Sequence, residues 1–148
     1  MGTSSRFSIA VHVLTLLASA GEENLKSDYM ACSVNTNPVV IRRLLCALGQ
    51  AKLVASQTGA SGGTRLARKP EEITLTEVYK AVETGTPFAL HRKRPSARCH
   101  VGKHIEAVLE SLQTEVDNAV AYALSRYTLK DVMNAIERTE KGAKLKYK

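Results

Sequence analysis

The sequence predicts a mainly α-helical fold with one small β-hairpin. Three observations predict it. Apolar residues recur at intervals of three and four in several segments, a glycine-rich stretch separates two short strand-like segments at residues 53–68, and an apolar stripe runs through residues 101–125. The 148 residues suffice for one domain with an additional helix or arm.

Three helices are predicted before the hairpin. The first covers residues 5–20, with Ser4 or Ser5 as its cap, and the second covers residues 27–33, with Ser27 as its cap. The third covers residues 38–51 and buries a stripe formed by Ile41, Leu44, Leu45 and Leu48. Asn37 can cap this third helix, and Pro38 suits its first position because no N–H is needed there. Two short helices joined by a tight turn, the second beginning with polar and basic residues, are typical of a helix-turn-helix.

The hairpin follows directly after these helices. Residues 53–57 and 64–68 are the predicted strands, and residues 58–63 form a glycine-rich tip. Glycines there permit positive φ and the close approach of another surface. The glycines lack both the Lys-Ser/Thr pair of a P-loop and a helix directly after them, so they do not predict nucleotide binding. A helix-turn-helix followed by a basic hairpin is a winged helix.

The rest of the chain is predicted to be helical apart from one basic loop. Thr74 and Glu77 form a potential capping box before a helix over residues 75–83. We divide the sequence into a winged helix-turn-helix domain at 1–83, a basic connecting or sensor loop at 84–100, a dimerisation helix with a short C-terminal helix at 101–138, and a flexible tail at 139–148. The stripe of the long helix is too long for so small a domain to cover, which favours a partner helix from a second copy. Its members are Ile105, Val108, Leu109, Leu112, Val116, Ala119, Val120, Ala123 and Leu124.

Composition limits the function classes. The chain has 21 Lys and Arg against 14 Asp and Glu, a net charge of +7 that favours a polyanionic partner. It has no apolar run near the roughly 18 residues that span a bilayer, and it has no signal-peptide pattern, so we expect no membrane association and a cytoplasmic location. Because the sequence contains no nucleophile elbow, zinc-protease helix or Walker lysine, we expect no enzyme activity.

Several segments carry a family likeness. They are Ser4-Ser5-Arg6-Phe7, the run from Ser33 to Arg43, the run from Gly62 to Leu75 and the run from Cys99 to Ile105. Together they resemble the Rrf-two family of bacterial transcription regulators, over residues 4 to about 136. The resemblance implies a homodimer, joined through the long helix, that binds an imperfect palindrome in double-stranded DNA and acts as a repressor. A winged-helix protein-interaction module and a non-specific DNA binder without a sensor role are the alternatives.

The expected DNA contacts come from the third helix and the hairpin. The N-terminal turn of a recognition helix enters the major groove, where Asn37 can read an adenine, unless its main role is as a cap, and Arg42 or Arg43 a guanine. Arg65 suits a narrow minor groove. The other expected contacts are Arg6, Ser33, Thr36, Pro38, Val39, Ser61, Gly62, Gly63 and Thr64.

Cys99 is the candidate sensor residue. Cluster-binding members of the family use three closely spaced cysteines before the long helix, whereas this sequence has only Cys99 there, so we expect no iron–sulfur cluster. Arg98, His100, Lys103 and a helix start would favour the Cys99 thiolate, as a redox sensor requires; a small, partly buried residue at the helix entry is the other interpretation. Cys32 and Cys46 are predicted at helix-packing positions.

Metal or effector binding has weaker support. His91, His100 and His104 lack a further ligand pair at a recognisable spacing, so no metal site is predicted. A small-molecule effector that binds near the loop at residues 84–100 is an alternative, and no residue identifies its chemistry.

Overall fold

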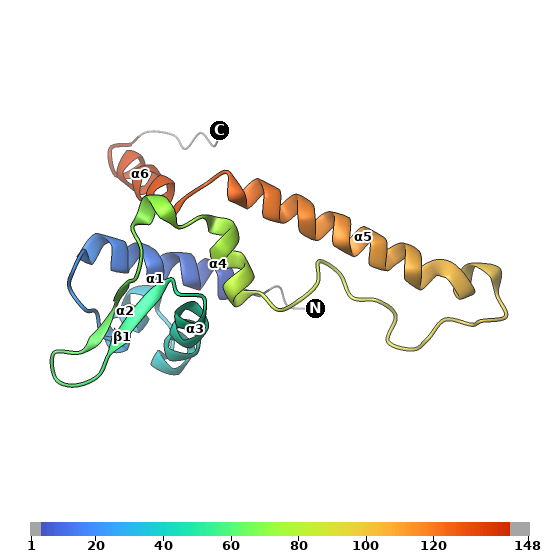
Figure 1. Cartoon of the computed structure of the whole chain (residues 1–148), viewed down its shortest axis with the longest axis horizontal. Helices are drawn as coiled ribbons and strands as arrows, with labels where there is room; N and C mark the ends of the chain where they lie inside the picture. The colour runs from blue at the N-terminus through green and yellow to red at the C-terminus, as the bar shows by residue number, and fades with distance from the viewer. Residues whose placement is uncertain (1–3, 143–148) are drawn as a thin grey trace. The chain divides into compact units, whose positions relative to one another are not determined.

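A computed structural model describes residues 4–142 and confirms a mainly helical chain with one two-stranded hairpin (Figure 1). The described residues divide into two compact units. The first comprises the residues up to Glu83 and those from Leu124 onward, and the second comprises Thr84–Ala123. In chain order the elements are α1 (Arg6–Ala20), α2 (Ser27–Val34), α3 (Pro38–Gln50), β1 (Val54–Gln57), β2 (Gly63–Leu66), η1 (Pro70–Glu72), α4 (Leu75–Val82), α5 (His100–Ser125) and α6 (Leu129–Glu140).

An aliphatic core holds the first unit together. All four residues of the predicted α3 stripe are buried, as are the inward-facing residues of α1 and α2. Burying such side chains is the main stabilising contribution to a small fold. The largest fully buried side chains are Leu14, Leu17, Met30, Ile41, Leu48, Leu53, Ile73 and Leu129, with Val13, Val78 and Val82.

Helix caps agree with the sequence at α3 and differ at α2. The Asn37 side chain accepts a hydrogen bond from the Val39 N–H at 2.8 Å, and Pro38 occupies the first turn, so the predicted cap is confirmed. The predicted cap at Ser27 is wrong. Ser27 is the first helical residue of α2, and the cap position belongs to Lys26, which makes no side-chain cap hydrogen bond.

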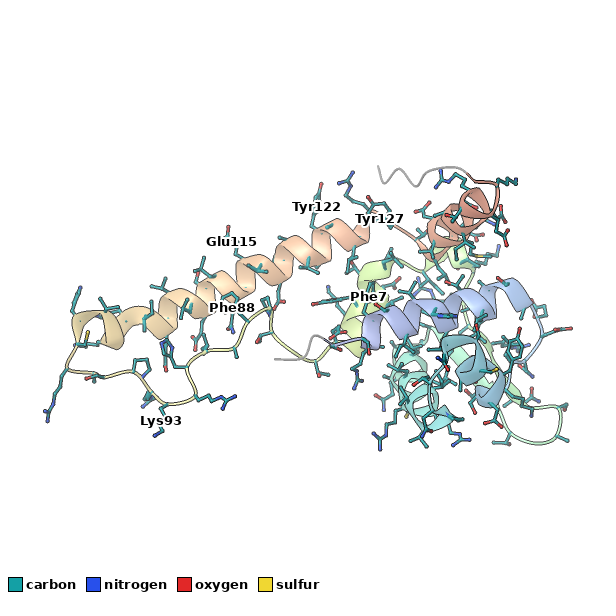
Figure 2. All side chains as sticks on the ribbon, turned by 180° about the vertical axis from the view of Figure 1, so that it is seen from behind. Phe7, Phe88, Lys93, Glu115, Tyr122 and Tyr127 are labelled. Atoms are coloured by element: carbon teal, nitrogen blue, oxygen red, sulfur yellow. The ribbon has the colours of Figure 1, made fainter. Side chains whose placement is uncertain are left out.

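The start of α1 is capped partly from a distant element. Ser4 Oγ accepts a hydrogen bond from the Arg6 N–H at 3.2 Å, whereas Ser5 makes no side-chain cap. The Glu83 carboxylate, which follows α4, accepts hydrogen bonds from the Phe7 N–H and from the Ser4 hydroxyl, each at 3.1 Å. Figure 2 shows Phe7 on α1, and its ring meets Tyr79 edge to face, with centroids 5.6 Å apart. The first helix is therefore attached to α4 at this end.

A third segment steadies the β1–β2 hairpin. The strands pair antiparallel from Val54 opposite Leu66 to Gln57 opposite Gly63. Leu25, just before α2, exchanges two backbone hydrogen bonds with Thr64, each at 2.9 Å. The predicted strands end two residues too late on the second strand, because pairing stops at Leu66.

Two glycines of the hairpin are required by its own packing. Gly63 has φ +142°, and a Cβ there would lie 2.7 Å from the Leu25 carbonyl oxygen. A Cβ on Gly62 would collide with the backbone at Gln57. The backbone segments that approach these two glycines closely are therefore the protein's own, at Leu25 and Gln57.

The C-terminal helix belongs to the first unit. The Leu75 N–H donates to the Tyr127 carbonyl and the Leu129 N–H to the Ile73 carbonyl, both at 2.9 Å, and Leu129 is fully buried. Capping boxes at Thr74 and at Thr128 start α4 and α6, the first as predicted. The sequence alone predicts this helix as part of a dimerisation region with the long one, whereas its contacts lie within the first unit. Its helical turns continue to Glu140, two residues into the predicted tail, and residues 143–148 of that tail lie outside the described residues.

The second unit consists of a loop and most of α5. Gln113 Nε2 on the helix donates to the Phe88 carbonyl at 2.6 Å, and Gly102 leaves room for the Ser96 carbonyl. Figure 2 shows Phe88 and Lys93 on this loop. All 26 residues of α5 are described and none is buried.

Candidate nucleic-acid interface

The N-terminal turn of α3 presents its predicted contact residues on the surface. Asn37 and Val39 are exposed, and Thr36 and Pro38 are half-buried. Arg42 and Arg43 are exposed one turn further along, on the side opposite the buried α3 stripe. The N-terminal half of the helix therefore exposes Asn37 and two arginines together with Val39 and Val40, side chains that can reach base edges and thymine methyl groups.

Arg42 is held only loosely. One guanidinium nitrogen lies 3.7 Å from an Asp28 carboxylate oxygen, and the two side chains are 59% and 79% exposed. Exposed pairs of this kind contribute little to stability, so the guanidinium can exchange the carboxylate for another anion.

The hairpin carries a second exposed arginine. Arg65 lies 3.8 Å from Glu22, and the side chains are 51% and 99% exposed. Ser61 is exposed at the tip, and its carbonyl accepts a hydrogen bond from Asn24 Nδ2 at 3.3 Å. Arg65 is thus available to a polyanion in the same way as Arg42.

Thr64, one of the predicted contacts, is buried. Its side chain is only 4% exposed, and its hydroxyl pairs with that of Ser56 at 3.0 Å. Gly62 is buried as well. Both residues shape the hairpin, and the sequence could not show this because the strand alternation alone does not say which face packs inward.

Arg6 and Ser33 have partners inside the unit. Arg6 Nε donates to the Val82 carbonyl at 2.7 Å, which ties the start of α1 to the end of α4. Ser33 Oγ lies 3.0 Å from His12 Nε2. Both residues are still at the surface.

Sequence reasoning missed a groove between α3 and the hairpin. This cavity, of about 680 Å³, has polar walls that include Lys26, Ser27, Arg42, Cys46, Ser56 and Thr58. No local sequence pattern marks this groove, because its lining comes from the start of α2, from α3 and from the hairpin, which only the fold brings together.

The cysteines correct another prediction. Cys32 and Cys46, predicted at packing positions, are exposed, because each lies beside the buried stripe of its helix. Cys99 is also exposed and belongs to the second unit, just before α5. The rings of His100 and His104 meet edge to face, with centroids 5.3 Å apart.

Residues 4–142 contain neither a metal-type cluster nor a membrane-crossing helix. No group of three or more His, Cys, Asp or Glu side chains is arranged to hold a metal ion. None of the helices in that range combines the length and apolarity that crossing a bilayer needs.

Comparisons with known proteins place this arrangement in a family. The sequence model described as "Rrf2: Iron-dependent Transcriptional regulator" matches residues 3–135. YwnA of Bacillus subtilis (strain 168), a protein assigned as an HTH-type transcriptional regulator, is 39% identical over 132 residues, which are 88% of this chain and 96% of YwnA. A crystal structure of a protein assigned as DNA-binding has 38% identity and a TM-score of 0.70, covering 87% of this chain and 99% of that one. CymR, the global cysteine regulator of B. subtilis, has 23% identity, a TM-score of 0.64 and coverage of 90% and 97%, which shows a shared fold. The chain belongs to the Rrf2 family and is a winged-helix, DNA-binding transcription regulator.

Proposed function

We propose that this regulator reads a specific double-stranded DNA sequence with α3 in the major groove and the β1–β2 hairpin at the neighbouring minor groove. The observation that carries the proposal is the pair of exposed arginines, Arg42 and Arg65, on two elements of one unit. Guanidinium groups pair bidentately with guanine edges and are attracted to narrow minor grooves. A protein that acts on a bacterial chromosome works in the cytoplasm, which is the location proposed here.

A homodimer joined through α5 is the second part of the proposal. Four aliphatic side chains along α5 are exposed: Val101 at 63%, Val108 at 54%, Leu112 at 45% and Val116 at 38%. A helix from a second copy would bury them in a coiled-coil-like seam. Two winged helices related by a twofold axis would match an imperfect palindrome, and repression is the role that the family resemblance supports.

Whether this chain binds an iron–sulfur cluster depends on the cysteine ligands that it offers. The matching family is described as iron-dependent. The loop before α5 contains a single cysteine, and no group of three ligand-type side chains is found in residues 4–142. This donor set does not fit a cluster held by three neighbouring cysteines.

Cys99 is the residue proposed to sense oxidation, because its thiol is exposed at the start of α5. A peroxide would take two electrons from the thiolate, leaving a sulfenate and releasing water or an alcohol. Thiol titration before and after peroxide, followed by a DNA mobility shift of the same sample, tests this. Oxidation of Cys99 with unchanged DNA binding contradicts it.

Selection of genomic fragments by the purified protein tests DNA reading itself. We expect enrichment of fragments that share one imperfect palindrome. Recovery of random fragments, with an affinity that falls steeply as salt is added, would identify a non-specific binder. Recovery of no fragments would favour the protein-interaction alternative.

A further inference from the structure

The groove between α3 and the hairpin has an apolar floor and a basic rim. Leu25, Leu45 and Val54 contribute to the floor. Arg42 and Cys46, one turn apart on α3, and Lys26, just before α2, also contribute to the lining. All of these residues belong to the first unit, so the groove does not depend on where α5 lies.

The charges of the groove favour an anion. Lys26 and Arg42 line it together with the hydroxyl groups of Ser27, Ser56 and Thr58, and no Asp or Glu is among the lining residues. Helix α2 starts here without a side-chain cap, so its first N–H groups favour negative charge; Asp28 in the same turn lies outside the groove lining.

Both cations can accept a new partner. Within residues 4–142, Lys26 Nζ makes one hydrogen bond, to the Gly59 carbonyl at 3.2 Å, which leaves its other hydrogens for an anion. In the same range, Arg42 has only the long, exposed contact with Asp28 at the rim.

The nature of the anion follows from the geometry of DNA, and this step rests on the proposed function. Since a phosphate strand separates the major groove from the minor groove, a protein with one element in each must hold that strand between the two elements. We propose that the groove holds a backbone phosphate of the bound DNA against Lys26 and the first turn of α2, beside the Arg42 that reads a base edge, and that Cys46 lies where an adduct on its sulfur displaces this phosphate.

Cys46 makes the proposal testable. The variant Cys32→Ser/Cys99→Ser leaves Cys46 as the single thiol, and both replaced cysteines are exposed, so the fold is expected to be kept. Two methanethiosulfonate reagents of similar size then add either a sulfonate or a trimethylammonium group. In each reaction the Cys46 thiolate attacks the reagent's sulfenyl sulfur and methanesulfinate leaves, so the product is a mixed disulfide.

Affinity for a selected duplex and for a random duplex is then measured by fluorescence anisotropy. We expect the sulfonate adduct to weaken both by about tenfold or more, and the cationic adduct to weaken them by less than about threefold. Equal losses with both reagents would show obstruction without a phosphate site, and no loss with either would show that the strand does not enter the groove. Either result overturns the proposal.

The matched control is the variant Cys46→Ser/Cys99→Ser, labelled at Cys32 on α2, outside the groove lining. Both adducts there should change affinity by less than about threefold. Circular dichroism confirms that each variant is folded. If the unlabelled proteins bind neither duplex, the proposed function fails; if they bind and the Cys46 adducts have no effect, only the groove assignment fails.

Lys26→Gln gives a second measure that does not use thiols. We expect weaker binding to every sequence and a fall of about 1 in the slope of log Kd against log salt concentration, because one phosphate contact is lost. Lys130→Gln removes the same charge from α6, at a distance from the hairpin within the same unit (Figure 1), and should leave the slope unchanged. Equal slopes for the two variants would contradict a phosphate at Lys26.

Discussion

At the scale of single residues, two arginines with similar surroundings are assigned different tasks. Arg42 and Arg65 each face one exposed carboxylate at nearly 4 Å, so neither is fixed by its own fold. They differ in the element that carries them. Arg42 projects from a helix that fits the major groove, whereas Arg65 projects from a hairpin suited to the backbone and minor groove.

The two alanine variants should therefore behave differently. Arg42→Ala is expected to cost about 1–3 kcal/mol on the selected sequence and to change which base is preferred at one position. Arg65→Ala should weaken all sequences alike and lower the salt slope by about 1. Anisotropy titrations across salt concentrations with a set of single-base operator variants measure both effects. Unchanged affinity in both variants would refute this interface.

Glu77 gives the clearest electrostatic expectation. Arg68 Nη1 donates to its carboxylate at 2.7 Å, and this hydrogen bond is the main reason why the pKa of Glu77 lies below its ordinary value, although burial opposes the shift. A carboxyl with a lowered folded-state pKa adds stability above its unfolded-state pKa, about 4.3, and loses it as the pH falls through the folded value.

Replacing Glu77 by Gln isolates this ion pair, because glutamine can keep the capping box. At pH 7 the variant should be less stable by under about 1 kcal/mol, since Arg68 and Glu77 are 35% and 40% exposed. The difference should disappear as the pH falls through the lowered folded-state pKa of Glu77, because protonation removes the charge that the Gln variant lacks. Urea unfolding at several pH values measures it, with Glu71→Gln, an exposed carboxylate on η1, as the control. A difference that persists at low pH would assign the effect to packing.

At the scale of elements, the sequence predicted the type of each helix better than the arrangement of the hairpin. The α3 stripe, the Asn37 cap and the Thr74 capping box were readable because they depend on residues within one or two turns. The inward side of β2, including Thr64, depends on the pairing with Leu25, which lies 39 residues earlier (64 − 25). Local patterns carry no information about such a contact.

Gly63 should be more sensitive to substitution than Gly59, the other hairpin glycine with positive φ. Gly59 and Gly63 both have positive φ, +100° and +142°, but a Cβ has no neighbour within 4 Å at Gly59 and meets the Leu25 carbonyl at Gly63. Gly59→Ala is expected to cost about 1 kcal/mol from backbone strain, and Gly63→Ala about 1–3 kcal/mol more. Urea unfolding compares the two. Equal losses would show that the approach of Leu25 is easily relaxed.

At the scale of the whole molecule, α6 completes the core of the DNA-binding unit. Leu129 is fully buried, so Leu129→Ala should lower the free energy of unfolding by about 2–5 kcal/mol. Ile136→Ala on the same helix, where the side chain is 47% exposed, should cost under about 1 kcal/mol. Chemical unfolding monitored by circular dichroism separates them. Similar losses would mean that α6 is only weakly packed.

The proposed dimer gives the second expectation at this scale. Leu112→Glu places a carboxylate in the exposed apolar stripe of α5 and should weaken association by about 2–5 kcal/mol, because an unpaired charge would be buried. Thr114→Glu adds the same charge on the polar side of the helix and should leave the dimer intact. Sedimentation analysis measures the mass of both. A dimeric Leu112→Glu protein would place the interface elsewhere.

The sequence by itself determined the helix-turn-helix, the hairpin, the long exposed helix and the family, because each follows from periodicity, caps and motifs that act over short distances. Only the tertiary structure decided that α6 joins the DNA-binding unit, that Thr64 and Gly62 are buried, that Cys46 is exposed, and that Lys26 shares a groove with Arg42. These features depend on contacts between residues far apart in the chain, which are set by how complete elements pack together.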